Sequence, residues 1–153
     1  MKRRDFLTLT AAATTVPFMA VPVLTVPLLA VPRPAFAAMA GVAYTPGLVA
    51  KHLAAGETVF LDFKASWCST CRSQEKTLAA LKADNPDYEK HITFIDVDWD
   101  DYGKSDLVAD LNIPRRSTLV VLKADDELGR IVAGTRRKTI KALMDVALAA
   151  ATP

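Results

Sequence analysis

The chain contains few of the residues that bind metals or cross-link small proteins. Its 153 residues include only two cysteines, Cys68 and Cys71, and two histidines, His52 and His91. A small scaffold held together by disulfides would need more cysteines. A zinc site needs four ligands, and the histidines lack the required spacing from the cysteines. No methionine and histidine cluster stands beside the cysteines to bind copper. We therefore expect no resident metal, and the cysteine pair is either functional or incidental.

The chain also lacks a large net charge. Without its first 37 residues, the numbers of basic and acidic residues are nearly equal. Residues 1–37 contain four of the 19 Lys and Arg residues and one of the 17 Asp and Glu residues, so the remainder has 15 basic and 16 acidic residues. The cluster Arg136-Arg137-Lys138 is explained as the solvated start of a helix. We therefore expect no nucleic-acid partner. The length supports one domain.

The N-terminal segment has the order of a secretory signal. A basic start at 2–4 precedes the uncharged apolar stretch 7–32, and small residues follow at 35–38. This order predicts cleavage after Ala37, which leaves 38–153 as the mature domain. The run Arg3-Arg4-Asp5-Phe6-Leu7 resembles the twin-arginine export signal, which implies a folded protein delivered to the periplasm.

A retained membrane anchor is the alternative reading of the same segment. The apolar stretch is long enough to span a bilayer. However, prolines recur every five residues in it, at Pro17, Pro22, Pro27 and Pro32. Proline removes backbone hydrogen bonds that a spanning helix needs, so a cleaved signal is favoured. In either case the body of the protein would lie outside the cytoplasm.

The body of the chain alternates between helical and strand-like spacing. Helical spacing of apolar residues covers 46–55, about 68–83, 105–111 and 139–149, and short apolar runs indicate strands at 58–63, 92–97, 118–122 and 130–133. Ser105 is the expected N-cap of the third helix. The strand–helix–strand order implies parallel neighbours, and the short turn at 124–129 makes the last two strands antiparallel. The sequence therefore predicts an α/β domain whose mixed four-stranded sheet carries helices on both faces.

The two cysteines stand where the first predicted strand gives way to a helix, in the run Trp67-Cys68-Ser69-Thr70-Cys71. Spacing of three residues on a helical turn brings their Cα atoms to about 5–6 Å, which suits a disulfide. The unpaired N–H groups and the dipole of the helix N-terminus favour a thiolate on Cys68. Cys71 lies one turn further in and keeps its proton longer. This asymmetry predicts that Cys68 forms the mixed disulfide and that Cys71 resolves it.

The segment from Phe60 to Cys71 resembles the active-site segment of thioredoxins, and the resemblance extends from about Glu57 to the C-terminus. It is also similar to the C-terminal thioredoxin-like domain of transmembrane thiol transporters. The resemblance implies a thioredoxin fold and assigns Asp62 as the buried acid that moves a proton to and from the resolving cysteine. It assigns Trp67 to shielding of the site, Thr118 to the start of the third strand and Gly134 to the rim of the substrate groove.

Four positions depart from the family pattern. Ser117 stands where the family has a cis-proline facing the disulfide. A cis bond before serine would cost roughly 3 kcal/mol, so a trans bond and a locally different loop are expected. Arg115 and Arg116 precede it and are placed to stabilise the thiolate, to select an acidic partner or simply to be solvated. Phe94 replaces a lysine that accompanies the buried acid, which predicts a more apolar setting for Asp62. Lys76 replaces the proline that kinks the active-site helix.

These features predict an exported thiol–disulfide oxidoreductase with Cys68, Cys71 and Asp62 as catalytic residues. Trp67, Arg116, Ser117, Thr118 and Gly134 are the predicted client-binding residues. The redox-active disulfide would be its only redox group, with no separate cofactor. Asp62 and the run from Trp67 to Cys71 resemble those of reductases, and the histidine that strongly oxidising relatives carry between the cysteines is absent. The resemblance therefore implies the reducing direction on protein disulfides. A membrane thiol-transporting reductase is the implied electron donor, and a monomer is expected.

Other interpretations of the same residues are possible. A structural disulfide closing so short a loop would contribute only about 2 kcal/mol. A redox-inactive module or chaperone could hold a client through Arg115, Arg116 and Ser117, and a peroxidase is a weaker third reading. Asp62 could be a satisfied aspartate at a strand end. The acidic run from Asp96 to Asp101 lacks the glycine and distal glutamate of a calcium loop, so it is read as a strand end entering a solvated loop.

Overall fold

A computed structural model of the chain describes residues 40–152. The predicted signal segment and its cleavage site lie outside these residues. Within them, no helix is both long enough and apolar enough to cross a bilayer. The membrane-anchor alternative also falls on the part of the chain that is not described.

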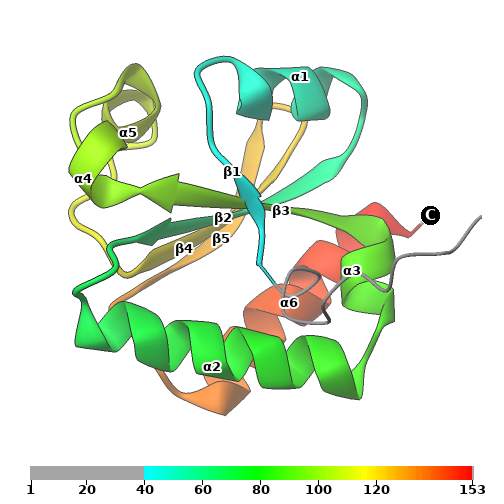
Figure 1. Ribbon diagram of the computed structural model, residues 1–153. Coiled ribbons are helices and arrows are strands. Elements are labelled where there is room, and N and C mark those ends of the chain that lie inside the picture. The colour runs from blue at the N-terminus through cyan, green and yellow to red at the C-terminus, as the bar shows by residue number, and fades with distance from the viewer. Residues whose placement is uncertain (1–39, 153) are drawn as a thin grey trace, which may run out of the picture. The chain divides into compact units, whose positions relative to one another are not determined.

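A five-stranded mixed sheet forms the centre of the domain (Figure 1), with the strand order β1-β3-β2-β4-β5. The strands are β1 (Val42–Ala43), β2 (Thr58–Lys64), β3 (Ile92–Asp98), β4 (Thr118–Lys123) and β5 (Asp126–Val132). β1 and β2 pair parallel with β3, whereas β4 pairs antiparallel with both β2 and β5. The predicted mixed α/β sheet is confirmed.

Two details of the predicted sheet were wrong. The sheet has a fifth strand because β1 adds two residues at its edge, and both are exposed. Two residues are too short to show any alternation of apolar and polar side chains. The final turn is also tighter than 124–129, since β5 already begins at Asp126. Ala124 adopts a left-handed conformation with φ of 50°, which closes the hairpin within two residues.

Helices cover both faces of the sheet, as predicted. They are α1 (Leu48–Ala54), α2 (Ser69–Asp84), α3 (Asp87–His91), α4 (Trp99–Tyr102), α5 (Asp106–Asp110) and α6 (Arg137–Ala151). Figure 1 shows α2, α3 and α6 on one face and α1, α4 and α5 on the other. α3 and α4 were not expected, because one-turn helices are too short for helical periodicity. Ser105 precedes α5 as predicted, but its side chain makes no capping hydrogen bond.

Alternation along β2 distributes its side chains between two hydrophobic cores. Phe60 packs with residues of α2, α3 and α6 in one core. Leu61 and Phe63 pack with residues of α1 and α5 in the other. Because alternate residues of a strand share a face, Asp62 and Lys64 lie on the same side as Phe60, toward α2. The strand thus delivers a carboxyl group to the space beneath the helix that carries the cysteines.

Candidate functional site

The two cysteines lie at the N-terminus of α2, as the motif predicts. Cys68 is the N-cap in an extended conformation, and its Sγ accepts a hydrogen bond from the Cys71 backbone N–H at 3.2 Å. Both are free thiols, and both are buried. The Cys68 sulfur therefore takes the place of the side-chain oxygen that usually caps a helix. A negative charge on this sulfur is favoured by the helix N-terminus.

The two thiols differ in acidity. Burial alone would raise the pKa of Cys68, but hydrogen bonds from the Cys71 thiol, the Ser117 hydroxyl and the Cys71 backbone N–H lower it to about 7, with a smaller contribution from Arg116. For Cys71, burial and the hydrogen bond with Cys68 raise the pKa above its usual value. Near neutral pH, Cys68 therefore ionises more readily than Cys71.

Ser117 lies beside both sulfurs. Its Oγ is 3.1 Å from Cys68 Sγ and 3.2 Å from Cys71 Sγ. The residue is fully buried, so its side chain faces the dithiol and has no solvent-facing surface to offer a client. The Arg116–Ser117 bond is trans, as expected, and Ser117 has a left-handed φ of 62° that proline could not adopt.

The backbone of Ser117 is held on both sides. Its N–H donates to the Phe63 carbonyl at 2.6 Å, and its carbonyl accepts from the Ala133 N–H at 2.8 Å. The same carbonyl accepts from Gln74 Nε2 at 3.1 Å. Gln74 was not identified from the sequence. Its position one helical turn after Cys71 places it on the same side of α2, but nothing in the sequence names its partners.

Gln74 also bonds to Gly134, one of the residues predicted from the sequence. Its amide nitrogen donates to the Gly134 carbonyl at 2.9 Å, so one side chain ties α2 to two loops. A Cβ on Gly134 would lie 2.7 Å from the Ile131 side chain, which explains why this position is a glycine. Thr118 begins β4 as predicted, and it is buried with its hydroxyl donating to the Arg115 carbonyl at 2.8 Å.

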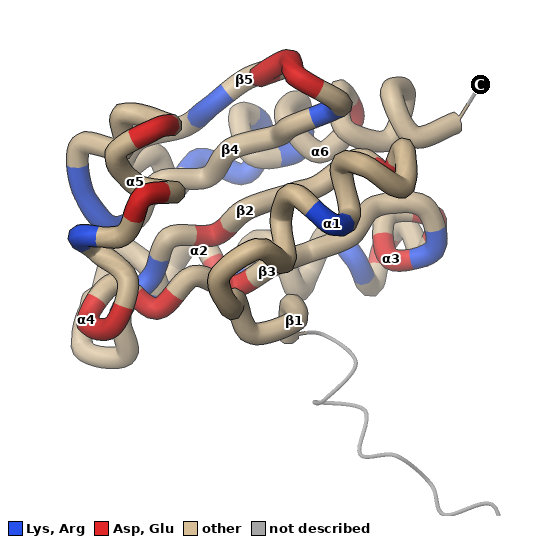
Figure 2. Tube along the Cα trace, turned by 90° about the horizontal axis from the view of Figure 1, so that it is seen from above, with Lys and Arg blue, Asp and Glu red and all other residues tan. Residues whose placement is uncertain are grey.

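Trp67, which is exposed, and Arg116, which is half-buried, form the rim of the site. Trp67 is 55% exposed, and its indole N–H donates to the Asp100 carboxylate at 2.9 Å. The Arg116 guanidinium lies 4.1 Å from the centre of the Trp67 ring, a cation–π contact. Figure 2 shows the acidic positions of α4 and the basic positions of the loop before β4 at the same end of the sheet. This rim therefore carries one exposed apolar ring and charges of both signs.

Asp62 lies in the interior between the sheet and α2. Burial raises its pKa to about 8, opposed by Lys64 and reinforced by Asp96, and its Oδ1 has no hydrogen-bond partner among the described residues. It lines a cavity of about 380 Å³ together with side chains of β2, β3 and α2. A buried carboxyl group with a pKa in this range can take up and release a proton near neutral pH.

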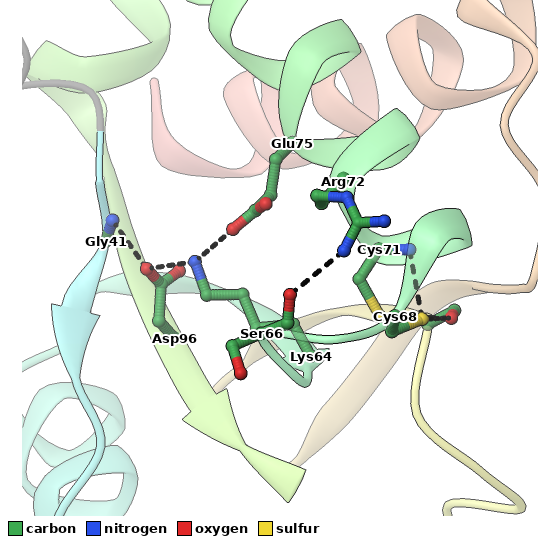
Figure 3. A network of polar contacts seen from close by, with 9 residues as sticks. Gly41, Lys64, Ser66, Cys68, Cys71, Arg72, Glu75 and Asp96 are labelled. Atoms are coloured by element: carbon green, nitrogen blue, oxygen red, sulfur yellow. Dashed lines mark hydrogen bonds and ion pairs between the residues drawn. The ribbon is translucent and has the colours of Figure 1, made fainter.

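The expected position of Phe94 beside Asp62 in the sheet was wrong, although Phe94 lines the same cavity. Phe94 pairs with Phe60 in the β2–β3 register, and the residue directly beside Asp62 is Asp96. Lys64 Nζ bridges Asp96 at 2.8 Å and Glu75 at 2.7 Å, the network drawn in Figure 3. An ion-pair network therefore lines the cavity beside Asp62. The error arises because a sequence does not state how two strands align.

The remaining departures and candidates are placed as follows. α2 continues unbroken through Lys76. The acidic run ends β3 at Asp98, which caps α4 by accepting from the Asp100 N–H at 2.8 Å. His52 bonds to Glu57 at 2.9 Å, outside the dithiol site. Among residues 40–152, no group of three or more His, Cys, Asp and Glu side chains is arranged to hold a metal ion.

The fold and the site together define a dithiol protein, in which an α/β sheet presents two cysteines at the start of a helix. The thioredoxin family model matches residues 42–146, and the chain belongs to this family. This finding and the topology confirm the predicted fold.

Thioredoxins are among the proteins that are similar to this chain in sequence. Thioredoxin H5 of Oryza sativa subsp. japonica is 34% identical over 86 residues, which cover 56% of this chain and 57% of that protein. An H-type thioredoxin of Fagopyrum esculentum is 33% identical over 82 residues, covering 54% of this chain and 65% of the relative. The matched region thus spans less than two thirds of either relative.

Solved structures share the fold at lower identity. The Trxlp structure from Edwardsiella tarda has a TM-score of 0.57 and 23% identity, covering 67% of this chain and 98% of the other. Thioredoxin from Trypanosoma brucei brucei has a TM-score of 0.58 and 17% identity, covering 74% and 95%.

Proposed function

We propose that this chain is a thiol–disulfide oxidoreductase that reduces protein disulfides through Cys68 and Cys71. One observation carries the proposal. The outer sulfur is the N-cap of α2 with a pKa of about 7, after hydrogen bonds outweigh the opposing effect of burial, and the inner sulfur lies one turn away with a raised pKa. This difference is what a two-step exchange requires, since the nucleophile must be ionised before the resolving thiol is.

The reaction proceeds in two displacements. The Cys68 thiolate attacks one client sulfur, so a Cys68–client bond forms, the client S–S bond breaks, and the first client sulfur leaves and takes a proton from water. Cys71 then attacks Cys68 Sγ. The Cys68–Cys71 bond forms, and the second client sulfur leaves with the proton that Cys71 loses. Two electrons pass from the dithiol to the client. The ionised form of Asp62 serves as the interior base that takes the proton from Cys71 and returns it for release with the second client thiol.

The rim suits the contact with a client. Trp67 offers an exposed apolar ring beside the nucleophile, and Arg116 is stacked on that ring. We propose that these two side chains bind the client segment around its disulfide. Ser117 is buried under the sulfurs, and Thr118 and Gly134 are held in internal hydrogen bonds, so their contribution is to shape the groove.

Export and reduction from the membrane complete the proposal. The twin-arginine resemblance of residues 3–7 supports delivery to the periplasm, with 38–153 as the mature domain. A reductase there needs electrons from across the membrane. The similarity of the active-site segment to thiol-transporter domains supports a membrane thiol-transporting reductase as the donor. The acting form would be a monomer, with no nucleic acid involved.

Trapping and potentiometry test the proposed activity. The Cys71→Ser variant, mixed with a disulfide-bonded protein, should accumulate a mixed disulfide on Cys68, visible by non-reducing electrophoresis. Cys68→Ser is the matched control and should trap nothing. Equilibration of the purified protein with glutathione and dithiothreitol buffers should give a reduction potential near or below about −230 mV.

Each other outcome has a defined meaning. A potential near about −120 mV would show that the protein donates disulfides, and the reducing direction would be wrong. Binding of a client with no trapped disulfide in either variant would favour the redox-inactive module or chaperone. Rapid turnover of a peroxide by the purified protein would favour the peroxidase.

A further inference from the structure

The Ser117 hydroxyl is shared between the two reacting sulfurs. Its Oγ lies 3.1 Å from Cys68 Sγ and 3.2 Å from Cys71 Sγ. A hydroxyl group has one proton to donate and rotates freely to choose its acceptor. The two sulfurs lie at almost the same distance from the hydroxyl. The hydroxyl will therefore donate its proton to whichever sulfur carries the negative charge.

The serine is held in place at a cost in backbone strain. A residue other than glycine at φ of 62° is disfavoured by roughly 1 kcal/mol or more. Hydrogen bonds to Phe63, Ala133 and Gln74 fix its backbone on both sides. Together with full burial, they leave the hydroxyl facing the dithiol and shielded from competing water.

We propose that the Ser117 hydroxyl is a catalytic group that stabilises the two thiolates in turn. This inference rests on the proposed exchange reaction and assigns a role to the residue that departs from the thioredoxin pattern. Proline has no side-chain hydrogen-bond donor, so the pattern residue could not play this part.

The hydroxyl acts at each displacement without being consumed. Before the first step it donates to the Cys68 thiolate. Once Cys68 is bonded to the client, its sulfur is neutral, and the hydroxyl turns to Cys71 Sγ. There it stabilises the negative charge that develops as Cys71 loses its proton and attacks. The proton of Cys71 still leaves with the second client thiol, so the balance of the reaction is unchanged.

Two substitutions separate the hydroxyl from the backbone. Ser117→Ala removes the hydroxyl and keeps the strained φ, whereas Ser117→Gly removes the hydroxyl and relieves the strain. Ser73→Ala is the control, because Ser73 is an exposed serine of α2 whose hydroxyl donates to the Ser69 carbonyl at 3.2 Å. Circular dichroism of each full-length variant verifies folding, and the glycine variant answers the question if the alanine variant is unfolded.

Stopped-flow reaction with dithiobis-nitrobenzoate gives the readout. One coloured thiol is released when Cys68 attacks, and a second is released when Cys71 resolves the mixed disulfide. Both Ser117 variants should slow the second release roughly tenfold, the effect of one hydrogen bond to a charged group. The pH midpoints of both phases should move upward, and Ser73→Ala should match the wild type.

The proposal is overturned if the second release keeps its rate and pH midpoint without the hydroxyl. It is also overturned if both variants slow without any movement of the pH midpoint, or if glycine restores the wild-type rate while alanine does not, since either result would identify backbone geometry as the cause. Because this small disulfide needs no protein client, failure here is distinct from failure of the proposed function, which would appear as no trapped client on Cys71→Ser.

Discussion

At the scale of single residues, burial of the Asp62 carboxyl group lowers the stability of the fold. Its carboxyl is buried, and Oδ1 has no hydrogen-bond partner among the described residues. Burial raises its pKa to about 8, while Lys64 acts in the opposite direction. Burial of a carboxyl group whose Oδ1 has no hydrogen-bond partner within residues 40–152 lowers stability, so we infer that Asp62 serves the chemistry of the site rather than the fold.

The substitution Asp62→Asn should make the protein more stable, and more so at higher pH. In the unfolded chain this carboxyl group ionises near pH 4, whereas in the folded protein it stays protonated until about pH 8. The folded state therefore binds the extra proton, and its stability falls as pH rises between these two values. Urea unfolding should show little difference at pH 4 and a gain of a few kcal/mol for the variant at pH 9.

A control isolates the effect of burial. Asp110 is exposed, and the stability of Asp110→Asn relative to the wild type should change little with pH. A gain for Asp62→Asn that stays constant from pH 4 to pH 9 would mean that the folded-state pKa is not raised.

The residue scale also marks where prediction from the sequence stopped. The burial of Asp62 could be expected, because Leu61 and Phe63 flank it in an apolar run. The neighbour of Asp62 on the next strand could not be expected, because the register that pairs Asp62 with Asp96 is set by the packing of whole strands. The lysine that balances it, Lys64, lies on the same strand two residues away, which is a local signal that alternation makes readable.

At the scale of elements, α2 is the part that joins chemistry to fold. Its start at the cysteines and its length follow from local sequence, and both were predicted closely. The conformation of the loop before β4 was not predicted, because Ser117 forms hydrogen bonds with Phe63 and Gln74, which are far away in the chain. Long-range hydrogen bonds of this kind leave no periodic pattern in a sequence.

Removal of the Gln74 amide should loosen this connection. In Gln74→Ala, the Gly134 carbonyl loses a donor and the Ser117 carbonyl keeps only the Ala133 N–H. Loss of buried hydrogen bonds should lower the free energy of unfolding by roughly 1–3 kcal/mol. Chemical denaturation measures the loss, and alkylation rates against pH should show a higher pKa for Cys68 as Ser117 moves.

The exposed residue Lys76, on the same helix, supplies the comparison. Lys76→Ala should change stability by less than about 0.5 kcal/mol and leave the pKa of Cys68 in place. If both variants behave alike, Gln74 does not hold the loop.

At the scale of the whole molecule, the proposed export from the cytoplasm can be tested separately from the activity. A twin-arginine signal would carry the domain across already folded, whereas the anchor alternative would keep it in the membrane. When the full chain is expressed in a bacterial host, the cleaved protein should appear in the periplasmic fraction with Ala38 as its first residue. Substitution of Arg3 and Arg4 by lysine together should abolish this export, since the signal depends on the arginine pair.

The control for charge is Lys2→Gln, which removes one positive charge and leaves the pair intact. Export of the double-lysine variant at the wild-type level would contradict the twin-arginine assignment. Recovery of an uncleaved chain in the membrane fraction would instead identify a retained anchor.

The chain has two tryptophans, and both stand at the dithiol. Trp99 packs against the cluster of Ala65, Cys68 and Cys71, whereas Trp67 is exposed and bonded to Asp100. Thiols and disulfides quench indole emission to different extents. The intrinsic fluorescence of the protein can therefore follow oxidation of the pair in real time without a label. Trp67→Phe and Trp99→Phe would separate the inner signal from the outer one.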